Sequence, residues 1–151
     1  MTPKGYISQA LALQASYLVL DGAKKNNNFP SGREELISTG LHQSSTIILV
    51  FAIEIALKGL LKLRFGSFRR THDLKKLYDD IPLNNRKRIS EIYKSKLERT
   101  DSTLESLLEL HKSMFVDLRY LDGFVNVVPN LKFLSKALDS IVNYYNEVKV
   151  D

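Results

Sequence analysis

The stretch Ile47–Leu74, IILVFAIEIALKGLLKLRFGSFRRTHDL, decides the fold of this chain. Its first half is apolar on nearly every side of a helix, and such a helix belongs at the middle of a bundle. Glu54 is the one acid within it, and Gly66 is expected to end the helix because glycine tolerates the left-handed conformation that closes many helices. The uninterrupted apolar run, Ile47–Ile53, falls well short of the roughly 20 residues that cross a membrane. We therefore expect a buried core helix and no membrane segment.

Helical periodicity continues on both sides of this stretch. Apolar residues recur at spacings of three and four over residues 4–20 and again over 131–145. Between them, Arg86–Arg99 is amphipathic and basic, and Leu104–Leu118 has an apolar stripe of its own. No strand repeat or Gly-rich phosphate loop accompanies these segments. The sequence therefore predicts an all-α protein, an up-down helical bundle of four main helices plus one or two short helices, in one domain over residues 1–151.

Local signals predict where the helices begin and end. Thr71 or Asp73 is expected to cap a short helix after the basic loop, and Gly40 is a candidate break between a short helix and the long one that follows it. Two pairs of residues have the spacing of a capping box: Ser31 with Glu34, and Ser102 with Glu105.

Composition narrows the chemistry that the chain can carry. It has 151 residues, a net charge of +5 and no cysteine, which excludes disulfides, thiolate metal sites and Cys nucleophiles. Three scattered histidines form no ligand cluster, so no metal site is expected, and we expect no cofactor. The first residues lack the apolar core of a signal peptide, and we expect a cytoplasmic protein.

The positive charge is unevenly distributed. Lys58–Arg99 contains 13 Lys/Arg and 5 Asp/Glu, a net of +8, whereas the rest of the chain has a net charge of −3. This asymmetry indicates either a surface for a polyanion such as nucleic acid or a solvated helix face with a basic loop. Because the basic groups lack interleaved aromatics, they favour phosphate contact over base reading. The candidate nucleic-acid contacts are Arg69, Arg70, Lys75, Lys76, Arg86, Lys87 and Arg88.

The acid of the core helix has a basic neighbour on its own helix face. Glu54 and Lys58 are four residues apart, in the order that favours an ion pair. The pair is either structural or part of a site. His72 either packs at a helix start or joins Arg69 and Arg70 in a polar patch that could contact phosphate.

His111 is the histidine with the most chemical promise. It lies on an apolar stripe and is expected to face the core or a partner helix. One interpretation is a satisfied core histidine. In the other, the helix continues to Arg119, with Asp117 and Tyr120 beside it, and His111 and Arg119 point into one pocket. There the Arg would bind phosphate and the His would move a proton, with Tyr120 as a further catalytic candidate.

Three segments, in this order, resemble a HEPN domain. They are IEIALKGLL (Ile53–Leu61), RRTHDLKKLYDDI (Arg69–Ile81) and FVDLRYLDG (Phe115–Gly123), and they span roughly half the chain. The resemblance implies a small α-helical bundle, commonly dimeric. Members of this family cleave RNA without metal or bind RNA or nucleotides, many of them in toxin–antitoxin, phage-defence or RNA-processing systems.

The resemblance also implies which polar residues matter. The family-like residues are Glu54, Lys58, His72, Asp73, Arg119 and Tyr120, with no catalytic role carried over. Our candidate ligand-binding residues are Glu54, Lys58, His72, Asp73 and Asp117.

The nuclease branch of the family carries an Arg, four to six residues, and then a His. Here seven residues separate Arg64 from His72, and no His follows Arg119, so the motif is absent in its usual form. The sequence therefore predicts a single HEPN-like domain that binds RNA or a nucleotide without cleaving it. A homodimer, a toxin–antitoxin or defence role and a nucleotidyltransferase-type antitoxin as partner follow from the resemblance. Two alternatives stay open: a metal-independent ribonuclease using His111 and Arg119, and a helical protein-interaction or immunity factor.

Overall fold

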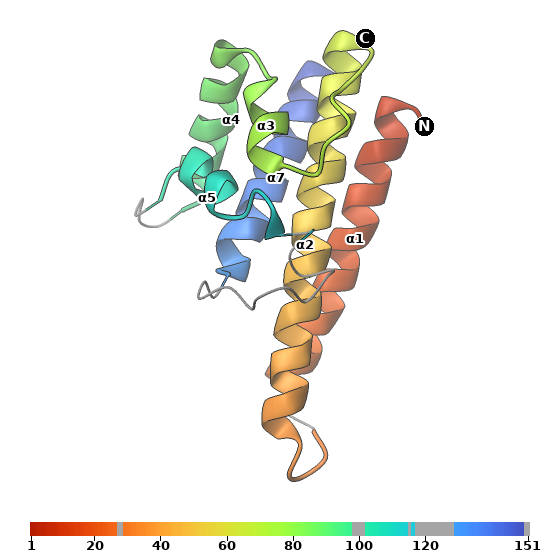
Figure 1. Ribbon diagram of the computed structural model, residues 1–151, viewed down its shortest axis with the longest axis vertical. Coiled ribbons are helices and arrows are strands. Elements are labelled where there is room, and N and C mark those ends of the chain that lie inside the picture. Colours follow the sequence, from red (N-terminus) through yellow and green to blue (C-terminus); the bar gives the residue numbers. More distant parts are fainter. Residues whose placement is uncertain (27–28, 98–101, 115, 117–128, 150–151) are drawn as a thin grey trace.

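The computed structural model describes residues 1–26, 29–97, 102–114, 116 and 129–149. These residues form an all-α bundle without strands (Figure 1). Within the described residues four helices are long and two are short, in line with the prediction: α1 (Pro3–Lys25), α2 (Glu34–Phe65), α3 (Leu74–Asp79), α4 (Leu83–Ser95), α5 (Leu104–Leu110) and α7 (Leu131–Val148). The long helices α1, α2, α4 and α7 alternate in direction along the chain, which is the predicted up-down order.

Helix α2 is the centre of the bundle. It packs against α1, α3 and α7, and nearly every residue from Leu49 to Leu61 is buried. A helix that is covered on all sides has to be apolar all round, which explains its composition. Glu54, in the middle of this segment, is only 1% exposed.

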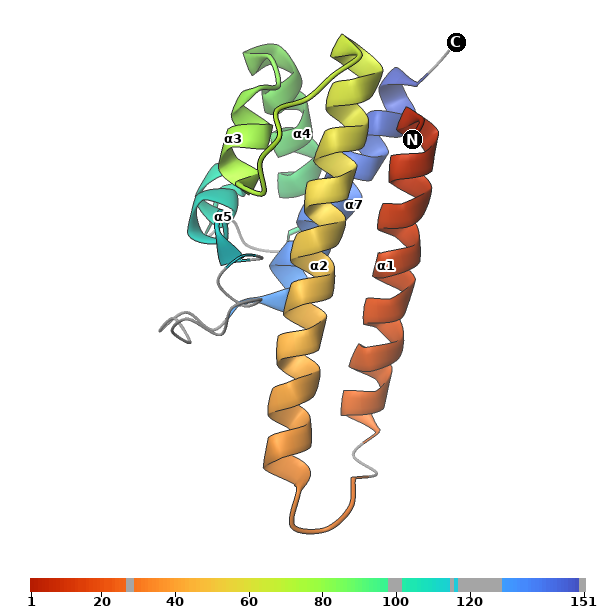
Figure 2. The same ribbon diagram turned by 45° about the vertical axis from the view of Figure 1, so that its right-hand side comes forward.

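Helices α1 and α2 form a long antiparallel hairpin, whose far end projects beyond the other helices (Figure 2). Near its other end the two helices come very close at Gly59. A Cβ at that position would lie 2.8 Å from the Cβ of Tyr6 and 3.4 Å from the carbonyl oxygen of Pro3. Only glycine allows this approach, so Gly59 fixes where α1 lies on α2.

The predicted ends around the basic loop are confirmed. Gly66 ends α2 in the left-handed conformation with φ of 73°, and Asp73 caps α3 by accepting a hydrogen bond from the amide of Lys76 at 3.0 Å. The hydroxyl of Thr71 accepts from the amide of Asp73, 3.1 Å away. The loop between α2 and α3 therefore has a defined conformation at both of its ends.

The start of α2 differs from the prediction. The helix runs through Gly40 without a break. Its N-cap is Arg33, which makes no side-chain capping hydrogen bond. The predicted capping box of Ser31 with Glu34 is therefore wrong.

The helix predicted over Leu104–Leu118 is also different. Thr103, not Ser102, caps α5, and the helix ends at Leu110. The amide of Leu74, the first residue of α3, donates a hydrogen bond to the carbonyl of Lys112 at 3.2 Å. In a continued helix that carbonyl would instead accept from the amide four residues further along the chain. The rest of the predicted stripe, Phe115 and Leu118, lies outside the described residues.

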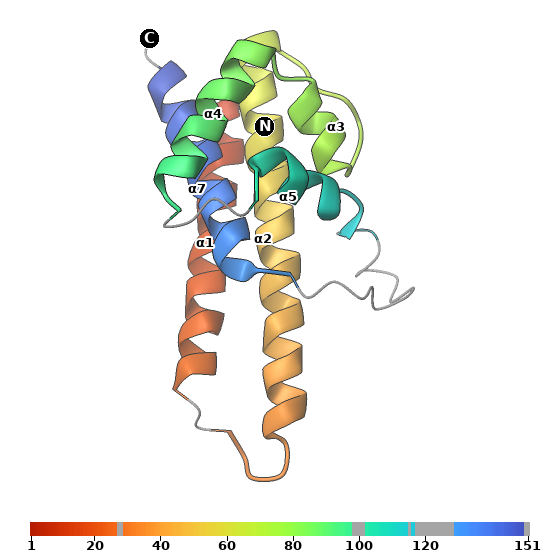
Figure 3. The same cartoon turned by 90° about the vertical axis from the view of Figure 1, so that its left-hand side faces the viewer.

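The remaining helices complete the bundle around α2 (Figure 3). Helix α4 packs against α7, and its buried residues are Ile89, Ile92 and Tyr93. Among the described residues, none of the helices combines the length and apolar character needed to cross a membrane.

Candidate functional site

A buried carboxylate lies at the point where α2 faces the α2–α3 loop. The ammonium of Lys58, one turn along α2, donates to Glu54 Oε1 at 2.6 Å, so the ion pair expected from the spacing is present. His72, from the loop, places Nδ1 3.1 and 3.2 Å from the two carboxylate oxygens. We call these three residues the Glu54 cluster. Two donors directed at one carboxylate offset the cost of burying its charge.

The three side chains of the Glu54 cluster differ in how far they are exposed to solvent. The side chain of Glu54 is 2% exposed, that of Lys58 15% and that of His72 51%. In the tautomer that carries a hydrogen on Nδ1, His72 donates to the Glu54 carboxylate. The cluster thereby ties the loop to the core helix and presents the imidazole at the surface.

An aromatic pair lies beside the cluster and alternates with lysines. The rings of Tyr6 on α1 and Phe68 in the loop meet edge to face, with centroids 5.5 Å apart. The ammonium of Lys58 lies 5.6 Å from the Phe68 centroid, and that of Lys62 lies 6.0 Å from the Tyr6 centroid. Cations at these distances are attracted to the ring faces. The interleaved aromatics that the basic segments lack in sequence are thus supplied by tertiary structure.

This end of the bundle is also free of acids over two long segments. Ile55–His72 contains five Lys/Arg and no Asp or Glu, and residues 1–20 contain no acid either. The two segments meet where Tyr6 packs on Gly59. Arg64 and Arg70 are exposed and form no ion pair with any described residue. We call Lys62, Arg64 and Arg70 the basic end.

Most of the predicted nucleic-acid contacts lie elsewhere and are paired with acids. Their ion pairs have N–O distances between 2.6 and 3.4 Å. Lys87 and Arg70 have no acidic partner within the described ranges. Much of the positive charge on α3 and α4 is therefore neutralised locally. The pairs are Arg69 with Asp80, Lys75 with Asp79, Lys76 with Asp73, Arg86 with Asp79 and Glu105, and Arg88 with Glu91 and Glu147.

His111 faces the core, as its place on the apolar stripe predicts. It is 1% exposed, and Nδ1 donates to the carbonyl of Leu107 at 2.7 Å. Burial lowers the pKa of His111 below its ordinary value of 6.5, and the hydrogen bond to Leu107 opposes that effect. Its Nε2 finds no hydrogen-bond partner in the part of the chain that the structure describes. The predicted neighbours Asp117, Arg119 and Tyr120 lie outside the described residues.

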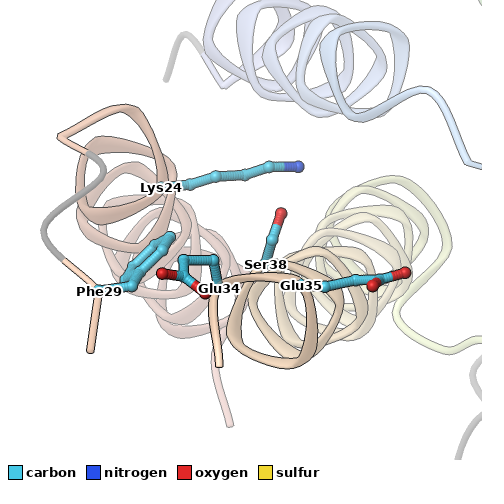
Figure 4. Close-up of a pocket in the computed structure, with 5 residues that line it drawn as sticks. All are labelled: Lys24, Phe29, Glu34, Glu35 and Ser38. Atoms are coloured by element: carbon cyan, nitrogen blue, oxygen red, sulfur yellow. The ribbon is translucent and has the colours of Figure 1, made fainter. Parts of the chain in front are cut away.

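A shallow pocket of about 460 Å³ lies at the far end of the α1–α2 hairpin (Figure 4). Lys24 and Ser38 point into the space between the two helices, whereas Glu35 points away from Lys24. His42 lies near Lys24, and its pKa is lowered by burial and, to a smaller extent, by that lysine. The acids that line this pocket, Glu34 and Glu35, are exposed. It brings together no residue predicted for the site.

Sequence reasoning missed Lys62, Arg64 and Phe68 as members of the site and assigned Tyr6 only to a core stripe. The acid-free run Ile55–His72 was a visible signal for the two cations. Nothing in the sequence indicated that Tyr6 and Phe68 would meet, because their contact depends on the approach of α1 at Gly59.

Comparison of the chain with known proteins identifies no relative. No family model, no curated protein and no solved structure matches the chain. Within the described residues, no group of three or more His, Asp or Glu side chains is placed to hold a metal ion. The resemblance to HEPN domains rests on the three quoted segments and stays a prediction.

Proposed function

We propose that this chain is a HEPN-like, non-catalytic module that binds RNA or a nucleotide, with phosphate contacts at the basic end. The observation that carries the proposal is the pairing pattern of the cations. Arg64 and Arg70 lack acidic partners among the described residues, whereas five of the seven cations first predicted as contacts have them. An unpaired guanidinium can bind a phosphate without first breaking an ion pair.

The surroundings of the basic end support a polyanionic ligand. No acid occurs in Ile55–His72 or in residues 1–20, so these two segments contribute only positive charge, which attracts phosphate. The half-buried rings of Tyr6 and Phe68 lie between Lys58 and Lys62. Cations alternating with aromatic rings are typical of surfaces that hold unpaired nucleotides.

The placement of His111 favours binding without cleavage. A general acid or base has to reach the proton that it transfers. His111 is 1% exposed, and its Nδ1 hydrogen is engaged by the carbonyl of Leu107. This geometry gives His111 a structural role at the end of α5. It adds no support to the alternative ribonuclease that used His111 with Arg119.

The test is binding of a labelled, unstructured RNA, followed by fluorescence anisotropy across a salt series. We expect affinity to fall steeply with salt, because each phosphate contact releases counterions. The same RNA should remain intact during incubation in EDTA. Undetectable binding at low salt, for this RNA and for nucleotides, would remove the proposal. Cleavage in EDTA would replace it with the ribonuclease alternative.

A further inference from the structure

Phe65, the last residue of α2, differs from every other aromatic side chain that the structure describes. It is 52% exposed, whereas the other described phenylalanines and tyrosines are half-buried or buried. Within the described ranges its ring meets no other ring and no cation. It also does not belong to the hydrophobic residues that pack against the core of the described bundle. Packing within the described bundle therefore does not account for this ring.

The position of Phe65 sets it apart from an ordinary exposed apolar residue. Lys62 and Lys58 precede it by three and seven residues, so the helical period places both on its side of α2. Arg64 is its neighbour in the chain and is exposed, without an acidic partner among the described residues. Figure 2 shows that α2 ends at the tip of the bundle. The exposed ring therefore lies at the basic end.

The other two rings near the basic end are already engaged. Lys58 lies over the ring of Phe68 and Lys62 over that of Tyr6, and these two rings meet edge to face. Of the three rings, Phe65 is the one that is open to solvent. An open aromatic ring among cations fits a single-stranded nucleic acid, because a base stacks on the ring while its phosphates bind the cations.

We propose that Phe65 stacks against an unpaired base of a single-stranded nucleic acid whose phosphates bind the basic end. This inference rests on the proposed function and adds the residue that selects the class of ligand. In a duplex the base faces are covered by neighbouring pairs, so a duplex uses the cations but not the ring. A single strand uses both, and the ring therefore favours strands with accessible bases.

The absence of tryptophan from the chain makes a direct test available. Phe65→Trp introduces a single fluorescent reporter at the proposed contact. A base that stacks on the indole quenches its fluorescence, so we expect saturable quenching by an unstructured RNA. Inorganic polyphosphate, which offers phosphates without bases, should not quench it. Leu36→Trp, at a 75% exposed position near the start of α2, is the matched control and should respond to neither ligand.

Removing the ring separates stacking from charge. Phe65→Ala should weaken the binding of single-stranded RNA about ten-fold. The slope of log K against log salt should stay unchanged, because no phosphate contact is lost, and the affinity for polyphosphate should also stay the same. Phe65→Tyr keeps an aromatic ring and should bind RNA as the wild type does. Because Phe65 is exposed, these variants should keep the helix content of the wild type, which circular dichroism checks.

The outcomes distinguish this inference from the proposed function. If the wild type binds no RNA, the proposed function is wrong and the inference is overturned with it. If the wild type binds RNA with a steep salt dependence but Phe65→Ala binds equally well and RNA does not quench Phe65→Trp, the inference alone is overturned. A blue shift of Phe65→Trp fluorescence on anionic lipid vesicles, without quenching by RNA, would assign the ring to a membrane surface and also overturn it.

Discussion

At the scale of single residues, the Glu54 cluster shows how a charge is accommodated in an apolar helix. The spacing of four residues was enough to predict the pair of Glu54 with Lys58, because both lie on one helix face. The second donor, His72, comes from a loop 18 residues away. Sequence periodicity does not specify the path of a loop, so this contact could not be derived beforehand.

The cluster makes a prediction for stability. Lys58→Met leaves the buried Glu54 carboxylate with His72 alone, and we expect a loss of about 3 kcal/mol in the free energy of unfolding. In the double variant Glu54→Leu, Lys58→Met no unpaired charge is buried, so the loss should be smaller than in Lys58→Met. Urea denaturation of the two variants measures the difference. Equal or greater loss in the double variant would show that the pair is not coupled.

His111 predicts a pH dependence of stability. Burial lowers its pKa in the folded chain below the ordinary 6.5, so on acidification the unfolded chain takes up the proton first. The stability that comes from a neutral His111 is therefore present above about pH 6.5 and is lost as pH falls below it. Lys112, its neighbour, is exposed and keeps its charge throughout.

The check is urea denaturation of wild type and His111→Leu at about pH 7.5 and 5.5, on either side of that ordinary value. The variant should lose less stability between the two conditions than wild type does. Part of the loss will remain, because His42 also has a pKa lowered by burial. Identical losses in the two proteins would contradict the assignment.

At the scale of elements, α2 contains two glycines with opposite roles. Gly59 faces α1, where an added Cβ would lie 2.8 Å from the Cβ of Tyr6. Gly40 has no atom of another element within 4 Å of such a Cβ. The sequence singled out Gly40 alone as a candidate helix break, and it takes the tertiary contact at Gly59 to tell the roles of the two glycines apart.

Alanine at these two positions should therefore have opposite effects. We expect Gly59→Ala to cost about 1–3 kcal/mol, because the added methyl overpacks the α1–α2 contact. Gly40→Ala should stabilise by up to about 1 kcal/mol, because alanine has the higher helix propensity and meets no obstacle. Thermal and urea denaturation of the two variants provide the comparison. Destabilisation by Gly40→Ala, or none by Gly59→Ala, would refute this description of α2.

The elements also show where sequence patterns are sufficient. The apolar periodicity predicted every long helix, and Gly66 and Asp73 marked the ends of the basic loop, since these signals act within a few residues. Capping-box spacing failed at Ser31, where α2 begins without a side-chain cap. The helix through His111 failed because Leu74, from α3, binds the chain just after it.

At the scale of the whole molecule, cations without acidic partners in an acid-free stretch of chain distinguish the basic end from the rest of the basic surface. The sequence predicted a net of +8 over Lys58–Arg99 but not which cations are paired. Glu105 and Glu147, which bind Arg86 and Arg88, come from helices outside that segment. Their positions depend on how α5 packs against α3 and how α7 packs against α4. Counting charges therefore located the basic region, while the fold singles out the basic end within it.

The most direct measurement compares two double variants in the salt titration of RNA binding. Arg64→Ala, Arg70→Ala removes two unpaired cations of the basic end, and Lys87→Ala, Lys94→Ala removes two exposed cations of α4. Our account predicts that the first pair weakens binding and reduces the slope of log K against log salt by about 1.4, at roughly 0.7 per phosphate contact of a single strand. The second pair should leave that slope unchanged. A reduced slope for the α4 variant, with none for the basic end, would contradict the account.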